Sequence, residues 1–156
     1  MKKRFFLLWA VVAFAFTVTS CEKDGNEPKE KNSLVGTKWK LVGFYDAEKN
    51  ELIEPEPKDC EECFTLDFIT ADTIGGKSSR FIIPGLYTVD YTLSTIRFDI
   101  FPRPAADEPG LGNIYVEYLT LSKKFELKEN ELKLYHLRKW WDNNIIGDYL
   151  LFQRKY

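Results

Sequence analysis

The stretch TKWKLVGF, residues 37–44, alternates apolar and polar side chains, with Trp39 and Leu41 in one set and lysines in the other. Successive side chains of a β-strand point to opposite faces, so this period of two predicts a strand with one buried face. The alternation recurs in three further stretches: FTLDF at residues 64–68, YTVDYTL at residues 87–93 and TIRFDI at residues 95–100. All four stretches predict half-buried antiparallel strands.

Two hairpins are predicted near the C-terminus. The stretch KFELKENELKLYH, residues 124–136, places a polar Lys-Glu-Asn turn between two alternating segments. A second hairpin is expected to run from Glu131 through the Asp-Asn-Asn sequence at residues 142–144. It returns in the last predicted strand, DYLLFQRKY at residues 148–156.

The stretch NIYVEYLTLSKK, residues 113–124, fits two patterns. Apolar side chains recur at helical spacing from Ile114 to Leu121, and Asn113 suits the N-cap position, but strand alternation fits almost as well. We favour a short helix. Before it lies a proline- and glycine-rich loop, FPRPAADEPGLGN at residues 101–113, which is too long for a tight turn.

These elements predict one domain, residues 34–156, of the all-β class with one short helix. About seven to nine short antiparallel strands would leave exposed edges in an open sheet, and closure into a small barrel removes those edges. The expected fold is therefore a small antiparallel β-barrel.

The N-terminus has the pattern of a secretory signal, with Lys2, Lys3 and Arg4 ahead of an apolar run. That run is shorter than the roughly 20 residues that a membrane-spanning helix needs. The tetrad Val-Thr-Ser-Cys ending at Cys21 resembles a bacterial lipobox, which implies that residues 1–20 are removed and Cys21 is acylated. The alternative is an ordinary signal peptide with a chance cysteine. The expected location is the cell envelope, on the outer membrane at its periplasmic face or the cell surface.

Residues 21–33 form a polar, charged segment that is expected to be a flexible linker. Without residues 1–20 the chain carries 19 basic and 24 acidic residues, a net charge of −5. Nucleic acid binding needs a basic footprint, so the composition argues against that partner class. The membrane, reached through the lipid anchor, is the expected partner.

Cys60 and Cys63 are the thiols that remain if Cys21 is acylated. An oxidising envelope favours a disulfide between them, which would fix the entry to the next strand. A zinc site needs four ligands, so carboxylates such as Asp59, Glu61 or Glu62 would have to complete a set with the two cysteines and His136, and a redox centre would need a helix after the pair. We favour the disulfide, with no metal or other cofactor.

The stretches LVGTKWKLVGF and YVEYLTLSKKFELKENELKLYH, with YLLFQRKY at the end, resemble the META and lipocalin-like small barrels. The resemblance covers the chain from about Leu34 onward and implies a small Bacteroidetes-type lipoprotein with such a barrel. The sequence departs from the META pattern because it lacks the central Gly-Cys-Asn turn and has Lys38 between Thr37 and Trp39. The resemblance implies no defined chemistry. In lipocalin-like barrels the first tryptophan often lies under an arginine of the last strand, and Arg154 is the candidate here.

Four inward aromatic residues of the strands have two interpretations, a filled core or the lining of a cavity for a small apolar ligand. They are Phe68, Tyr87, Tyr91 and Phe98. Trp39 is expected to be core. A filled core is the more frequent fate of such a face, so we favour it.

Trp140 and Trp141 are adjacent, so on a strand they would point to opposite faces, and one is expected at the surface. An exposed tryptophan near a loop could contact a glycan, a lipid headgroup or a protein. Its alternative role is to cover the hairpin.

The sequence does not favour an enzyme. His136 continues the apolar face of its strand, TIGGKSS at residues 73–79 lacks the spacing of a phosphate-binding loop, and the acidic runs DCEEC and ADEPG read as solvated loops. The expected function is a lipid-anchored, non-enzymatic binding or scaffolding module of the envelope. The alternative is a carrier of a small apolar ligand, and a hydrolase using His136 is more remote.

Overall fold

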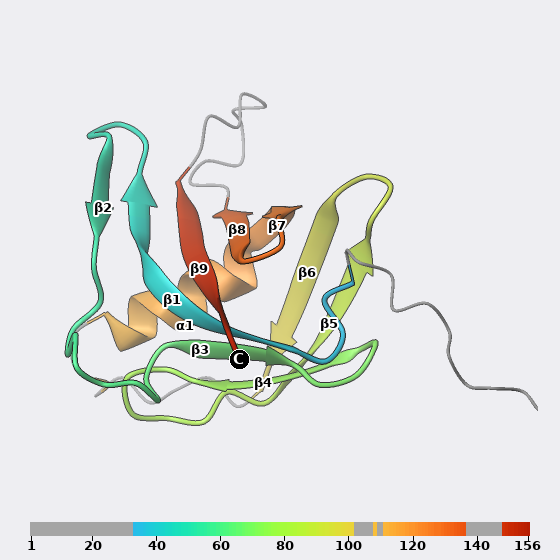
Figure 1. Ribbon diagram of the computed structural model, residues 1–156, viewed down its shortest axis with the longest axis horizontal. Coiled ribbons are helices and arrows are strands. Elements are labelled where there is room, and N and C mark those ends of the chain that lie inside the picture. Colours follow the sequence, from blue (N-terminus) through green and yellow to red (C-terminus); the bar gives the residue numbers. More distant parts are fainter. Residues whose placement is uncertain (1–32, 102–107, 109–110, 137–147) are drawn as a thin grey trace, which may run out of the picture.

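The computed structural model describes residues 33–101, 108, 111–136 and 148–156 (Figure 1). Within these residues the chain forms nine strands and one helix. The strands are β1 (Thr37–Asp46), β2 (Glu51–Ile53), β3 (Thr65–Phe68), β4 (Thr73–Lys77), β5 (Gly85–Asp90), β6 (Thr95–Ile100), β7 (Ser122–Leu127), β8 (Glu131–His136) and β9 (Tyr149–Lys155), and the helix is α1 (Gly112–Leu121).

Eight of the strands close into an antiparallel barrel, which confirms the predicted fold class. The order runs from β1 through β3 to β9, and β9 returns to pair with β1 from Tyr149 opposite Tyr45 to Lys155 opposite Lys38. The short strand β2 pairs with the far end of β1, beyond the residues that pair with β3. Because β1 has a partner on both sides, it leaves no open edge.

The junction between β6 and β7 has a single paired position, Thr95 opposite Lys124. The helix α1 lies between these strands in the sequence, and its last residue is followed directly by the first residue of β7, Ser122. Its buried residues include Tyr115, whose hydroxyl donates to Thr65 O over 2.9 Å, and Leu119. Figure 1 shows α1 passing behind β1, β9 and β8. The buried face of the helix therefore packs onto the barrel core, with Tyr115 against Phe152 of β9 and Tyr118 against Phe44 of β1.

The alternation of the sequence matches the burial of the strands. Phe64, Leu66 and Phe68 are at most 1% exposed, and the inward side chains of β6 and β8 are buried in the same way. The hairpin between β7 and β8 also forms as predicted, since Lys128 N donates to Glu131 O across its turn. Every second side chain of these strands contributes to one continuous core.

Two local predictions were wrong. The helix begins at Gly112 with Leu111 at the N-cap and no side-chain cap, so Asn113 lies inside its first turn. The alternation through YTVDYTL does not continue as a strand, because β5 ends at Asp90, whose carboxylate accepts hydrogen bonds from Thr92 N and Leu93 N. This local turn outcompetes the extended conformation.

The strands β2 and β4 were not predicted. Three of the five residues of β4 are Gly75, Gly76 and Lys77, and glycine is disfavoured in strands because it has no side chain to pack. The strand forms because β3 pairs with it along four residues, from Thr65 opposite Lys77 to Phe68 opposite Ile74. Long-range pairing here overrides local propensity.

Candidate functional site

The end of the barrel that α1 covers, which we call the helix-side end, carries three buried ionisable side chains. They are Asp46, His136 and Asp148, with exposed fractions of 7%, 2% and 6%. The carboxylate of Asp148 accepts a hydrogen bond from Ala47 N over 2.9 Å, which ties the start of β9 to the turn after β1. His136 N donates to Asp148 O over 3.3 Å. These bonds hold together the two positions that flank residues 137–147.

His136 lies on the buried face of β8, as its alternation predicted. Its ring packs 3.8 Å from the ring of Tyr118 on α1, measured between centroids, and Tyr118 in turn meets Phe44 of β1 edge to face. The histidine is thus part of the contact between helix and barrel.

A small cleft of about 40 Å³ opens at the helix-side end. Its lining combines aromatic rings of β1 and α1 with the carboxylates of Asp46 and Asp148. About 10–15 Å³ of such space holds one water molecule and ligand pockets measure roughly 300–1,000 Å³, so this cleft has room for a few waters rather than a ligand. Among the described residues, no group of three or more His, Cys, Asp or Glu side chains is placed to hold a metal ion.

Trp39 lies at the opposite end of the barrel core and is fully buried. Its indole nitrogen donates to Thr37 Oγ1 over 2.7 Å, and Thr37 in turn donates to Leu34 O. The guanidinium of Arg154 stands over the indole ring at 5.9 Å from its centroid. The arginine of the last strand therefore lies where the lipocalin-like resemblance implied.

Three of the four candidate aromatic residues pack against one another. The ring of Phe68 lies 4.9 Å from that of Tyr87 and 6.3 Å from that of Phe98, and all three side chains are at most 2% exposed. Tyr91 does not join them. It lies in the turn after β5, is 41% exposed and meets Phe125 with the edge of its ring. The expected position of Tyr91 inside the barrel is therefore wrong, because the strand ends one residue earlier.

Burial raises the pKa of Tyr87 to about 12, with smaller contributions from Tyr91 and Asp72. Its hydroxyl donates to Thr70 O over 2.9 Å, which favours the neutral phenol. Burial also raises the pKa of Tyr115 well above its ordinary value. Both phenols therefore stabilise the fold in their protonated forms.

We expect the stability of the protein to fall between pH 10 and about pH 12. The unfolded chain loses the Tyr87 proton near pH 10.0 whereas the folded chain keeps it to about pH 12, so the stabilisation is present below pH 10 and lost above it. The midpoint of urea unfolding, measured in steps across this interval, should fall less in Tyr87→Phe than in the unaltered protein. Equal falls in the two proteins would contradict this assignment.

Cys60 and Cys63 lie at disulfide distance, with 1.99 Å between their sulfur atoms, directly before β3. Lys40 of β1 donates from Nζ to the carbonyl oxygens of both cysteines. Burial lowers the pKa of Lys40, and the nearby charge of Lys155 lowers it further. The pair and the lysine together hold the entry to β3 against β1.

Glu108 is a buried site residue that the sequence analysis missed. The run ADEPG was expected to be a solvated loop, but the Glu108 side chain is only 6% exposed. One of its oxygens, Oε1, accepts hydrogen bonds from Ser78 Oγ, from Ser79 Oγ over 3.1 Å and from Arg80 N over 3.1 Å. Only the fold brings these serines beside the carboxylate, so no local signal could have identified the contact.

Glu108→Ala is expected to lower the free energy of unfolding by about 1–3 kcal/mol, because it removes the acceptor shared by the buried hydroxyl of Ser78 and the partly buried donors Ser79 Oγ and Arg80 N. Glu108→Gln keeps a side-chain oxygen and should cost less. Urea unfolding of both variants measures the difference. Equal losses of unfolding free energy in the two variants would show that the hydrogen bonds accepted by Glu108 Oε1 do not stabilise residues 78–80.

The remaining candidate residues, Cys21, Trp140 and Trp141, lie outside the described residues. No helix in the described part of the chain has the length and apolar character needed to cross a membrane.

Comparisons with known proteins support the fold. No family model and no curated protein matches the chain. A DUF4847 family protein from Bacteroides vulgatus is 18% identical, with a TM-score of 0.56 over 74% of this chain and 90% of its own. A protein from Burkholderia xenovorans, solved by NMR, is 21% identical, with a TM-score of 0.57 over 78% of this chain and 83% of its own. At these identities the similarity shows the barrel fold alone.

Proposed function

We propose that the protein is a lipid-anchored module of the cell envelope that binds or scaffolds another macromolecule and has no enzymatic activity. The anchor is supported by the order of basic patch, apolar run and Val-Thr-Ser-Cys tetrad before Cys21. A META-like relationship of the barrel is part of the proposal, supported by the residues of β1, α1 and the last two hairpins.

The observation that carries the binding role is that the residues on either side of residues 137–147 are hydrogen-bonded to each other. This segment contains Trp140 and Trp141, and its flanks are joined by the hydrogen bond between His136 and Asp148. Both flanking residues are buried, and Asp148 is tied to the turn after β1. Binding residues are frequently carried by segments that connect the elements of a rigid scaffold, and residues 137–147 connect β8 to β9 in the sequence.

The proposed role of His136 is structural. Its ring is buried against Tyr118, so it contributes to the contact of α1 with β8. The packing of Phe68, Tyr87 and Phe98 favours a filled region of core over a carrier cavity at these residues.

A photo-crosslinking amino acid placed at Trp141 in the full precursor tests the proposal in cells. We expect a discrete crosslinked product at this position, and none when the same group replaces Arg97, an exposed residue on the outer wall of β6. Labelling with an alkyne fatty acid should mark the protein and disappear in Cys21→Ser.

Identical products at both positions, or none at Trp141, would contradict the binding role. Unchanged fatty-acid labelling in Cys21→Ser would contradict the anchor. The two halves of the proposal therefore fail separately.

A further inference from the structure

Four exposed apolar side chains surround the place where the described chain begins, and we call them the entry rim. They are Val35, Ile69, Tyr91 and Leu93, with exposed fractions of 44%, 58%, 41% and 67%. Single exposed apolar residues are ordinary on protein surfaces, but several that converge on one place from separate segments indicate a contact surface.

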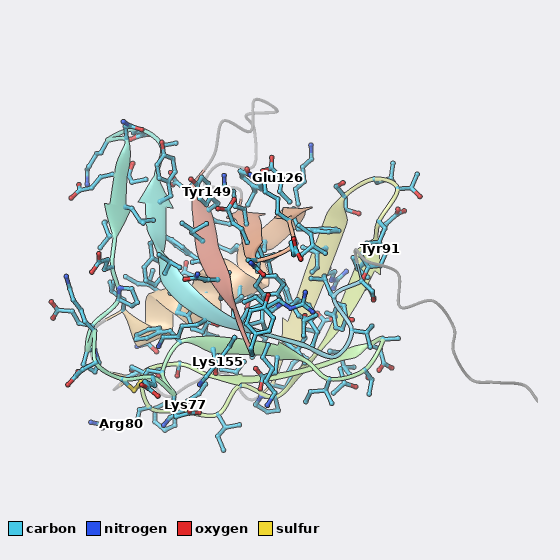
Figure 2. The ribbon with its side chains drawn as sticks, in the orientation of Figure 1. Lys77, Arg80, Tyr91, Glu126, Tyr149 and Lys155 are labelled. Carbon is cyan, nitrogen blue, oxygen red and sulfur yellow. A yellow bond between two sulfur atoms is a disulfide. The ribbon has the colours of Figure 1, made fainter. Side chains whose placement is uncertain are left out.

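Hydrogen bonds bring the three segments of the entry rim together. Leu34 N donates to the hydroxyl of Tyr91 over 3.0 Å, which joins the start of the chain to the turn after β5. Gly36 N donates to Phe68 O over 2.7 Å, which joins the same start to the end of β3. Figure 2 shows Tyr91 on the side of the barrel where the described chain begins.

We propose that the entry rim rests on the lipid surface to which the chain is anchored. This inference rests on the proposed acylation of Cys21. The eleven residues 22–32 connect that cysteine to the barrel, and a flexible chain of eleven residues has a root-mean-square length of about 20 Å. A domain of this size has a diameter of roughly 35 Å. Because the tether is shorter than the domain, it keeps the rim toward the membrane.

The chemistry of the rim fits contact with the apolar part of a lipid interface. Asp72 and Asp90 lie in the adjoining turns, Lys124 is exposed opposite Thr95, and the chain without residues 1–20 carries a net charge of −5, so no net attraction to anionic headgroups is expected. Aliphatic side chains and a tyrosine favour the boundary between headgroups and acyl chains. The rim is therefore expected to associate with zwitterionic lipid.

A competing apolar surface lies elsewhere on the barrel. Ile82 and Phe101 are 77% and 71% exposed, and Lys77 and Arg80 flank the first of them. Figure 2 shows Lys77 and Arg80 well separated from Tyr91. The tether leaves from the rim and not from this second surface, so the second surface supplies the matched control.

The orientation also agrees with the proposed binding role. β1 runs from Thr37, beside the rim, to Asp46 at the helix-side end, about 30 Å away along a ten-residue strand. A rim on the membrane would hold the flanks of residues 137–147 away from the lipid.

The test is hydrogen exchange on the acylated mature chain in vesicles of phosphatidylethanolamine and phosphatidylcholine. Its reference is the same chain with Cys21→Ala, free in solution. We expect the amides of residues 69–73 and 91–94 to exchange about fivefold more slowly in vesicles, and those of residues 47–50 and 79–83 to be unchanged. The double variant Ile69→Ser/Leu93→Ser should lose this protection, and Ile82→Ser/Phe101→Ser should keep it.

Protection at residues 79–83 instead, or no protection in protein that still floats with the vesicles, would overturn the rim proposal while leaving the anchor intact. Protection that needs envelope proteins in the vesicles would replace the lipid by a protein partner and overturn it as well. Acylation-competent chain that does not float with vesicles would refute the anchor, and the rim proposal with it.

Discussion

Trp39→Ala is expected to lower the free energy of unfolding by about 3–5 kcal/mol, the range for removing a large buried aromatic side chain. The indole is fully buried and its nitrogen bonds Thr37, which in turn bonds Leu34, so the substitution opens a cavity and loosens the start of the chain. The midpoint of urea unfolding, monitored by far-ultraviolet circular dichroism, measures the loss.

Two variants separate the contributions at this position. Trp39→Phe keeps most of the volume but removes the hydrogen bond to Thr37, and should cost about 1–2 kcal/mol. Arg154→Ala removes the cation over the ring and should cost no more than about 1 kcal/mol. If Trp39→Ala costs no more than Arg154→Ala, the burial of the indole does not stabilise this end of the barrel core.

Gly76→Ala is expected to destabilise the protein by about 3 kcal/mol or more, from backbone strain and overpacking together. Gly76 has φ +153°, a conformation that residues with a Cβ rarely adopt, and a Cβ there would lie 2.2 Å from Thr65 O on the neighbouring strand. A carbonyl oxygen of the paired backbone cannot move aside without breaking the pairing of β3 with β4.

The preceding glycine provides a matched control. A Cβ at Gly75 would meet only the side chain of Ile69, with Cδ1 at 3.0 Å and Cγ1 at 3.8 Å, and this exposed side chain can rotate away. Gly75→Ala should therefore change stability by less than about 1 kcal/mol. Thermal unfolding of the two variants under identical conditions compares them. Similar losses in both would mean that β4 needs glycine for a reason other than the approach of Thr65.

The fold class was predictable from the sequence because alternation is a local signal. Trp39 and Leu41 are buried, and Phe98 and Leu134 are buried at the positions that their strands predicted. The contact of Arg154 with Trp39 was also foreseen, but from the lipocalin-like resemblance and not from the pattern of the residues. Sequence pattern identifies which face of a strand is apolar before its partner strand is known.

The candidate site was less predictable. The flanks of residues 137–147 could be assigned to strands, but the hydrogen bonds that Asp148 accepts from Ala47 N and from His136 N join segments that the sequence separates. In the sequence Glu108 has the pattern of a solvated acidic residue, and only the folded chain brings residues 78–80 into hydrogen-bond contact with its carboxylate. Such contacts carry no local periodicity.

The sequence by itself determined the all-β class and the inward face of most strands, because both follow from side-chain spacing within a few residues, whereas for the short helix the spacing favoured a helix over a strand without deciding between them. Only the tertiary structure decided the closure of β1 on β9, the glycine-rich strand β4, the exposed turn at Tyr91 and the burial of Glu108. Pairing, turn and burial there depend on hydrogen bonds and close approaches between particular backbones and side chains. These hydrogen bonds and close approaches form only when the barrel is closed. Their free energy then exceeds the local conformational preference of the residues involved.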